Sequence, residues 1–218
     1  MAVVKKQSRF VSNILYFVGK YILKLFFHIE VEKPFEKLDF REPLLILVKH
    51  QSNFDVMIGY AVLRQILHRY PWAITKKMFA HPVFLGLFLK TGSIPVDRKN
   101  PRNSKNDLLA ARKILYAGNA IVIFPEQSRV PGKMGEGKVG GFRFIAGKPE
   151  TPLAVLTVGM RYERDIIRKK VVIRFGSLSY YSKEDNADVF MYQRMKEIAE
   201  LSGMDYPFLA PVEPRKEV

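Results

Sequence analysis

The stretch from Pro43 to Asp55, PLLILVKHQSNFD, decides the fold, because a short apolar run in it ends directly in a polar turn. Leu44 to Val48 are five consecutive apolar residues with no 3.6-residue repeat, which predicts a strand buried on both faces. Helical spacing resumes at Phe54. We therefore expect His50 at the end of a strand and Asp55 in the first turn of the next helix.

The spacing of His50 and Asp55 permits a catalytic pair. On one helix, side chains five positions apart would diverge, whereas a strand-to-helix corner can bring them together. A carboxylate beside an imidazole fixes its tautomer and stabilises the imidazolium that forms when the ring takes a proton. Alternatively, His50 is a structural turn residue and Asp55 an acid favoured by the helix dipole. The H-x-x-x-x-D pattern alone leaves both interpretations open.

The composition predicts one domain with a basic surface. The chain has 218 residues, and its 36 Lys and Arg against 21 Asp and Glu give a formal net charge of +15. Such a charge attracts nucleic acid, acidic lipid or phosphorylated small molecules. Because cysteine is absent and there are four histidines, disulfides and thiolate sites are excluded and a multi-histidine metal site has little to build from. We expect neither a metal nor a cofactor.

Residues 1–29 are predicted to anchor a domain of residues 30–218 to a membrane. The apolar stretch 10–29 has no cleavage site typical of a signal peptide, and Lys20 near its middle argues against a spanning helix. On a helical wheel a broad apolar face opposes a mostly cationic stripe of Arg9, Asn13, Tyr16, Lys20, Lys24 and His28. This favours one helix, or two separated at Gly19, lying on the anionic cytoplasmic face of the cell membrane as a peripheral or monotopic element. The alternative is a helix packed on the protein's own core.

The rest of the chain alternates strands with helices, which predicts an α/β domain with a central, mostly parallel or mixed sheet flanked by helices. Residues 31–42 are expected to form an exposed connection, and the apolar stretch 78–89 either core or the wall of an apolar channel. We expect helices over 56–70, 104–116 and 182–202, and strands over 72–75, 92–98, 120–124, 151–158 and 170–175.

Three polar turns follow predicted strands, at His50, at Arg98 and at residues 126–129. Sites in open α/β sheets collect at strand ends, so these turns could face one crevice. The loop 130–141 carries five glycines as well as Lys133 and Lys138, which would let backbone amides approach an anion closely.

Together the three turns resemble the glycerolipid acyltransferase family, whose best-known members are the 1-acylglycerol-3-phosphate O-acyltransferases. The similarity runs from about residue 31 to residue 158. The family's N-H-x-x-x-x-D block matches Lys49-His50 through Asp55, its G-x-I-x-V-x-R block matches Gly92 through Arg98, and its F-P-E-G-T-R block matches Phe124 through Arg129. One block is a weak signal, but three in this order and spacing favour the catalytic interpretation of His50.

The resemblance implies an acyl transfer without a covalent enzyme intermediate. His50, oriented by Asp55, would take the proton of an acceptor hydroxyl, which then attacks the thioester of acyl-CoA or acyl carrier protein. The implied acceptor is a lysophospholipid, 1-acylglycerol-3-phosphate, and the product is phosphatidic acid for phospholipid biosynthesis.

The resemblance also implies an acceptor site made of basic side chains. Arg98 and Arg129 would grip the phosphate, and Lys76 would add a charge. Glu126 would orient its loop or receive a glycerol hydroxyl. The other possible loop contacts are Gln127, Ser128 and Lys138. The alternative for the arginines is a solvated basic face.

Three departures from the family pattern leave the acceptor open. Gln127-Ser128 replaces the usual Gly-Thr, Lys49 replaces the usual asparagine, and Leu156-Thr157 replaces a Val-Pro pair. A different lysolipid or a polyol is therefore an alternative acceptor.

Two other functional classes compete with the acyltransferase. The first is a basic nucleic-acid-binding module, but no aromatic strand signature or zinc pattern supports it, so we expect no nucleic-acid partner. The second is a metal-dependent phosphohydrolase using Asp55, Asp97 and Glu126.

Overall fold

The computed structural model describes residues 6–34, 42–76, 89–97, 104–164 and 166–211. Its helices are α1 (Arg9–Phe17), α2 (Asp55–Leu67), α4 (Lys105–Tyr116), α5 (Val139–Ala146) and α6 (Ala187–Ser202). Its strands are β1 (Phe27–Glu32), β2 (Leu44–Val48), β3 (Trp72–Lys76), β4 (Ser93–Val96), β5 (Ala120–Ile123), β6 (Leu153–Arg164) and β7 (Lys169–Tyr181).

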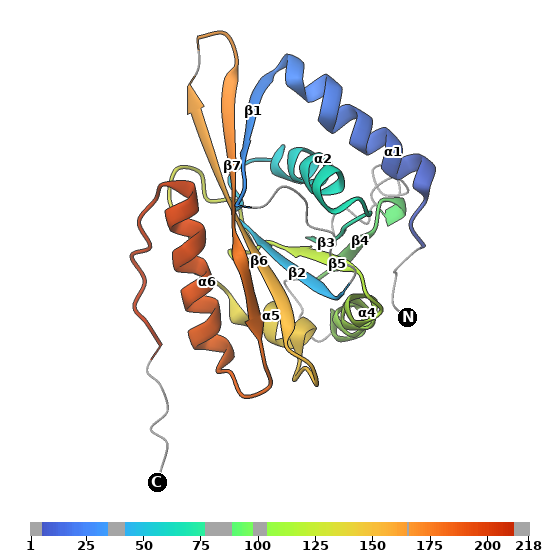
Figure 1. Ribbon diagram of the computed structural model, residues 1–218, viewed down its shortest axis with the longest axis vertical. Coiled ribbons are helices and arrows are strands. Elements are labelled where there is room, and N and C mark those ends of the chain that lie inside the picture. The colour runs from blue at the N-terminus through green and yellow to red at the C-terminus, as the bar shows by residue number, and fades with distance from the viewer. Residues whose placement is uncertain (1–5, 35–41, 77–88, 98–103, 165, 212–218) are drawn as a thin grey trace.

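Within these residues the strands form one seven-stranded sheet in the order β1-β7-β6-β2-β5-β3-β4 (Figure 1). Neighbouring strands run parallel except for β6 and β7, which are antiparallel. Helices cover both faces of the sheet. The predicted α/β fold with a mostly parallel, mixed sheet flanked by helices is therefore confirmed.

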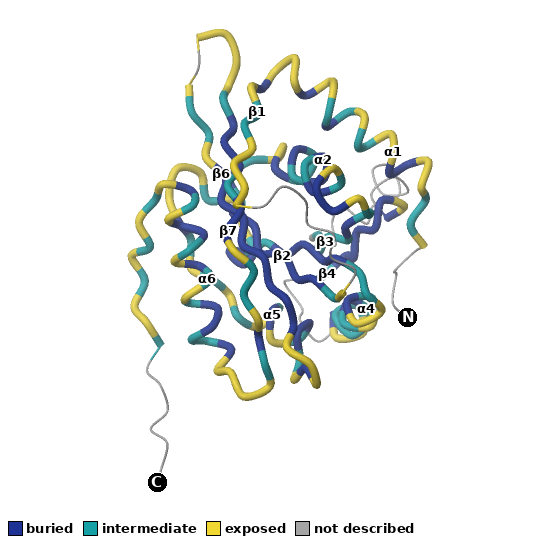
Figure 2. Tube along the Cα trace, viewed as in Figure 1, coloured by how far each residue is buried: buried dark blue, intermediate teal, exposed yellow. Residues whose placement is uncertain are grey.

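The central strand β2 is buried on both faces, as its unbroken apolar run predicted (Figure 2). Leu45 and Leu47 pack into the core beneath α4, α5 and α6, while Leu44, Ile46 and Val48 pack into the core beneath α2. Each buried aliphatic side chain contributes about 1.5–3 kcal/mol, so this strand strongly stabilises the sheet. The polar turn that follows it therefore starts from a rigid base.

The N-terminal segment differs from its prediction. The helical backbone continues from α1 through a π-helical turn, Val18–Ile22, and a 3₁₀ turn, Leu23–Leu25, and then becomes strand β1, which pairs with β7. The expected helix to residue 29 is thus wrong, and the predicted domain boundary at residue 30 falls inside β1. In the expected connection 31–42, residues 31–34 are exposed, although the first two belong to β1, and residues 35–41 lie outside the described residues. The sequence FHIEVE alternates with period two, which suits a strand. Its two glutamates pair with Lys170 and Arg174 of β7.

Gly19 brings this helical segment into close contact with α2 and does not interrupt it. A Cβ atom at Gly19 would lie 2.6 Å from the Cβ of Ala61, so a larger residue would push the two helices apart. The opposite side of the segment exposes an apolar row made of Phe10, Ile14, Phe17, Tyr21, Ile22, Leu25 and Phe26. In the described part of the chain, no helix combines the length and hydropathy that a membrane span requires.

The C-terminal half contains a longer hairpin than predicted. Strands β6 and β7 pair from Leu153–Tyr181 to Arg164–Lys169, and their tip extends beyond the body of the molecule (Figure 1). Helix α5 begins at Val139, within the last three residues of the predicted glycine-rich loop, and continues beyond it to Ala146. Helix α6 begins at residue 187 because the Asn186 side chain accepts hydrogen bonds from the first backbone N–H groups. Most of the apolar stretch 78–89 lies outside the described residues.

Candidate active site

His50 and Asp55 meet at the corner between β2 and α2. The Nδ1 atom of His50 lies 2.9 Å from Oδ2 of Asp55, and the His50 ring stacks on Phe124 with centroids 4.3 Å apart. The strand end and the first helical turn thus place the two side chains as the spacing predicted. Because Nδ1 engages the carboxylate, Nε2 is the ring nitrogen available for proton transfer.

Asp55 is held in one orientation by donors on both carboxylate oxygens. Its Oδ2 also accepts from the backbone N–H groups of Gln51, at 2.6 Å, and Ser52, at 2.7 Å. Its Oδ1 accepts from the Tyr162 hydroxyl at 2.5 Å. The side chain is buried. This anchoring fixes the histidine tautomer and leaves the carboxylate little freedom to rotate away from the ring.

No local pattern in the sequence indicates the part that Tyr162 plays. It lies on β6, 107 residues from Asp55 along the chain, inside a charged stretch. Its ring packs edge-on against Phe27 of β1, with centroids 6.4 Å apart. Burial, together with the Asp55 carboxylate, raises the pKa of the Tyr162 hydroxyl, so that the group remains a hydrogen-bond donor.

A Tyr162→Phe substitution should therefore slow the reaction while preserving the fold. It removes one donor to a buried carboxylate and keeps the ring that packs on Phe27, so we expect kcat to fall about tenfold with little change in KM. Steady-state kinetics and the thermal unfolding midpoint, measured side by side, test this expectation.

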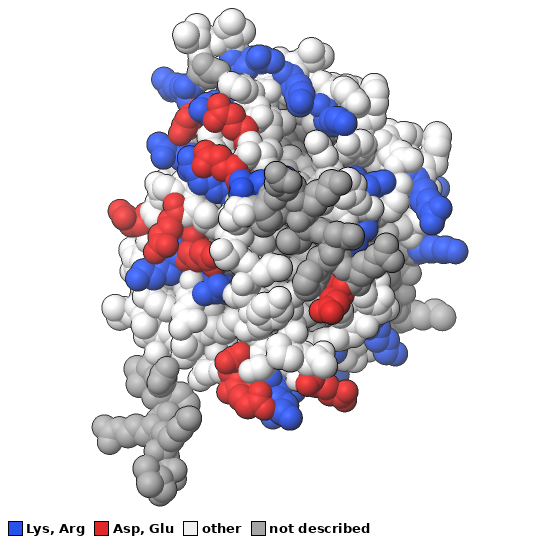
Figure 3. Space-filling view, in the orientation of Figure 1, with Lys and Arg blue, Asp and Glu red and all other residues white. Residues whose placement is uncertain are grey.

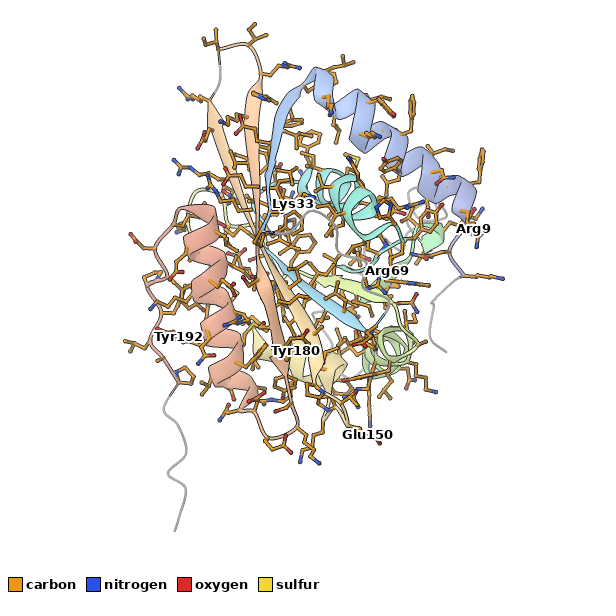
Figure 4. All side chains as sticks on the ribbon, viewed as in Figure 1. Arg9, Lys33, Arg69, Glu150, Tyr180 and Tyr192 are labelled. Atoms are coloured by element: carbon orange, nitrogen blue, oxygen red, sulfur yellow. The ribbon has the colours of Figure 1, made fainter. Side chains whose placement is uncertain are left out.

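Tyr180→Phe is the matched control, because Tyr180 is exposed and lies at the other end of the β6–β7 hairpin (Figure 4). That variant should keep the wild-type kcat. If Tyr162→Phe lowered only the thermal stability and left kcat at the wild-type value, the role of Tyr162 would be purely structural.

A buried ion pair joins the His50 turn to the loop after β5. Lys49 Nζ lies 2.7 Å and 2.9 Å from the two carboxylate oxygens of Glu126, and both side chains are almost fully buried. Glu126 also accepts from the backbone N–H groups of His50, at 3.0 Å, and Gly135, at 2.6 Å. Burial lowers the pKa of the Lys49 ammonium, and the Glu126 carboxylate partly offsets this effect.

These contacts suit the first of the two roles predicted for Glu126, that of orienting its loop, and the role itself stays a prediction. Its carboxylate oxygens are occupied by donors from within the protein, so the structure does not present them to an acceptor hydroxyl. Lys49, which departs from the family pattern, carries the positive charge that offsets the free-energy cost of burying the Glu126 carboxylate. The pairing was not visible in the sequence, because 77 positions separate the partners.

The structure describes some of the other predicted acceptor residues and not others. The Arg129 guanidinium donates to Asn53 Oδ1, and the adjacent Val130 N–H donates to the His50 carbonyl at 2.9 Å, so the third motif lies against the first. Ser128 is exposed beside them. Lys76 ends β3, but its side chain is outside the described part of the structure, as is the whole of Arg98.

A cavity of about 300 Å³ lies next to Phe124, at the low end of the range for small-molecule sites. Its lining includes the polar residues Asp97, Ser104, Gln127 and Lys138, together with apolar side chains of β3, β4, β5, α4 and α5. Lys138 is exposed and pairs with Glu136. Gln127 has a φ of 56°, in the left-handed region that glycine tolerates best. The family's glycine at this position therefore has a backbone reason.

The metal-dependent alternative finds no support in these contacts. Among the residues that the structure describes, no group of three or more histidine, aspartate or glutamate side chains is placed to hold a metal ion. Asp55 and Glu126, two of the three carboxylates in that hypothesis, are each bound to protein donors instead.

Comparison with protein families identifies this arrangement. The family model described as Acyltransferase matches residues 28–160, which include the His50–Asp55 pair, the Lys49–Glu126 pair and Arg129. The chain belongs to the acyltransferase family. Tyr162 lies just beyond the matched region of this acyltransferase.

Individual relatives agree with the family match. A probable 1-acyl-sn-glycerol-3-phosphate acyltransferase of Mycoplasma genitalium is 26% identical over 156 residues, which cover 70% of this chain and 55% of that protein. A chloroplastic 1-acyl-sn-glycerol-3-phosphate acyltransferase of Brassica napus is 26% identical over 151 residues, covering 64% and 42% of the two chains. The acyltransferase described here thus spans about half the length of the curated relatives that it matches.

A solved structure shares the fold. The crystal structure of the 1-acyl-sn-glycerophosphate acyltransferase of Thermotoga maritima superposes with a TM-score of 0.60 at 15% sequence identity. The match covers 87% of this acyltransferase and 80% of the Thermotoga chain.

Proposed function

We propose that this acyltransferase transfers a fatty acyl group from an acyl thioester, acyl-CoA or acyl carrier protein, to the free hydroxyl of 1-acylglycerol-3-phosphate, forming phosphatidic acid for phospholipid biosynthesis. The observation that carries the proposal is the His50–Asp55 contact of 2.9 Å at the end of a fully buried strand. The names of the similar proteins support the choice of acceptor.

In the proposed reaction His50 acts as the general base. Its Nε2 takes the proton of the acceptor hydroxyl while the oxygen attacks the thioester carbonyl carbon. Asp55 stabilises the imidazolium that results. The C–S bond then breaks as the ester forms, and the proton passes from His50 to the departing thiolate. No enzyme nucleophile is needed, because a thiolate is a good leaving group.

The acceptor phosphate is proposed to bind beside the His50 turn. The Arg129 guanidinium is exposed and donates to Asn53 Oδ1 in that turn, and its planar fork suits a phosphate. The cavity at Phe124, with Lys138 and Gln127 in its lining, offers space for part of a substrate. Gln127, which departs from the family pattern, would then contribute to how this site holds its acceptor.

The proposed site of action is the cytoplasmic surface of the cell membrane, where both lipid substrate and product reside. The apolar row of residues 10–26 supports this location, since it is exposed on the outer side of the segment. Basic side chains border the row along the same side (Figure 3). A cationic and apolar surface of this kind binds anionic bilayers in the interfacial plane.

The test is an acyl-transfer assay in detergent that follows thiol release from acyl-CoA and, separately, from acyl carrier protein. Lysophosphatidic acid, other lysophospholipids and glycerol 3-phosphate are offered as acceptors. We expect thiol release to require lysophosphatidic acid and phosphatidic acid to accumulate with it. Turnover with another lysolipid but not with lysophosphatidic acid would refute the acceptor, and the absence of transfer to every acceptor would refute the activity.

A further inference from the structure

The tip of the β6–β7 hairpin exposes two adjacent isoleucines. Ile166 is 99% and Ile167 is 89% exposed, at the point where the hairpin extends farthest from the body (Figures 1 and 2). Large aliphatic side chains are costly in water, and a hairpin tip can be built from polar turn residues instead. A function that buries them would explain their presence.

The tip is joined to the apolar row of the N-terminal segment. The Arg168 guanidinium donates to the Lys24 carbonyl at 2.6 Å, and the next residues along that segment, Leu25 and Phe26, are 70% and 63% exposed. Strand β1 then pairs with β7 from Phe27 onward. The hairpin tip and the end of the helical segment therefore form one exposed apolar end of the molecule.

Basic residues surround this apolar end. Residues 161–170 contain five basic and two acidic side chains. Arg164, Arg168 and Lys169 are exposed next to the isoleucines, and Lys24 is exposed on the neighbouring segment. An apolar tip with a cationic rim matches the boundary between acyl chains and anionic headgroups, where nearby Lys and Arg side chains are attracted to the negative surface.

We propose that the β6–β7 hairpin tip inserts into the headgroup region of an anionic lipid bilayer and forms a second membrane contact beside the N-terminal segment. The inference rests on the proposed lipid acceptor, which resides in such a bilayer. Tyr162, the donor to Asp55, lies on β6, and Ile166 follows it by four residues in the turn beyond the end of that strand. At about 3.3 Å per residue the tip is only roughly 13 Å from that site, so insertion would hold the dyad near the lipid surface.

Site-specific fluorescence tests the insertion directly, because the chain has no native cysteine to interfere. Ile167→Cys and Lys183→Cys are each labelled with an environment-sensitive nitrobenzoxadiazole and mixed with vesicles of phosphatidylglycerol and phosphatidylcholine. Lys183 is exposed and follows β7 at the end opposite the hairpin tip, so it serves as the control. We expect a blue shift and a severalfold gain in emission at position 167 alone. Unchanged emission at position 167 in protein that floats with the vesicles would overturn the proposal.

Vesicle flotation measures the contribution of the isoleucines. The Ile166→Ser/Ile167→Ser variant should show a partition coefficient at least about tenfold lower than wild type, since two aliphatic side chains no longer gain from burial. The control Leu209→Ser removes a side chain near the C-terminus that is 94% exposed, and this variant should bind vesicles as the wild type does. Partitioning of the double variant at the wild-type value would also refute insertion.

Two further measurements separate this proposal from its alternatives. In detergent with lysophosphatidic acid, the double serine variant should transfer acyl groups at the wild-type rate, because no bilayer is present for the hairpin tip to contact. If the wild type itself were inactive in this assay, the proposed reaction would be refuted and the hairpin proposal would not. Sedimentation without vesicles should show no dimer that depends on the isoleucines. A wild-type dimer that the double variant loses would assign the tip to self-association instead.

Discussion

A His50→Ala protein is expected to fold normally and to lose acyl transfer by at least about 10²- to 10⁴-fold, the usual value of a positioned general base. The substitution leaves Asp55 with its donors from Gln51, Ser52 and Tyr162, so the buried carboxylate remains satisfied. The measurement is the initial rate of thiol release with lysophosphatidic acid, together with the thermal unfolding midpoint.

His68→Asn is a suitable control for this prediction. His68 ends α2, is exposed, and has a φ of 52°, a backbone conformation that asparagine tolerates. The control should retain wild-type turnover and stability. If His50→Ala also retained its turnover, His50 would not be the base, and the proposed mechanism would have to be abandoned.

A Lys49→Met substitution is expected to lower the free energy of unfolding by about 3–5 kcal/mol, because it leaves the buried Glu126 carboxylate without its counter-charge. The two remaining donors, the N–H groups of His50 and Gly135, do not neutralise it. Denaturant unfolding in mildly alkaline buffer measures the effect.

The double variant Lys49→Met/Glu126→Gln separates charge from packing. It removes both charges, so it should be more stable than Lys49→Met alone in alkaline buffer. Lys183→Met is the exposed control, since Lys183 lies 3.7 Å from Glu184 in solvent and such pairs contribute about 0–1 kcal/mol. A loss below about 1 kcal/mol in Lys49→Met would mean that water or another group replaces the ammonium.

The parts of the fold that the sequence predicted are those specified by local patterns. The strand Leu44–Val48 is recognisable because a strand covered on both faces consists of consecutive apolar residues, and all five of its residues are indeed buried. His50 and Asp55 could be paired because only a strand-to-helix corner lies between them. The family resemblance then supplied the third motif, whose Arg129 lies against the first.

The rest depended on contacts between distant segments. Tyr162 reaches Asp55 only because the β6–β7 hairpin is longer than its short apolar cores suggested, and the charged residues around its tip concealed that length. Similarly, strand β1 is an edge strand whose partner, β7, is more than a hundred residues away. Nothing near Phe27 therefore indicates that the predicted helix ends before it. Lys49 stands out in the sequence only as a departure from the family pattern, since nothing local indicates its partner Glu126.

The left-handed backbone at Gln127 limits which residues protein engineering can place at this position. A non-glycine residue there carries a conformational cost of roughly 1–2 kcal/mol, whatever its side chain touches. Replacement by glycine or asparagine therefore changes the cavity lining and relieves the backbone together, whereas a β-branched replacement adds strain while it reshapes the cavity. Directed evolution of acceptor preference at position 127 should thus favour a narrow set of residues for reasons unrelated to the substrate.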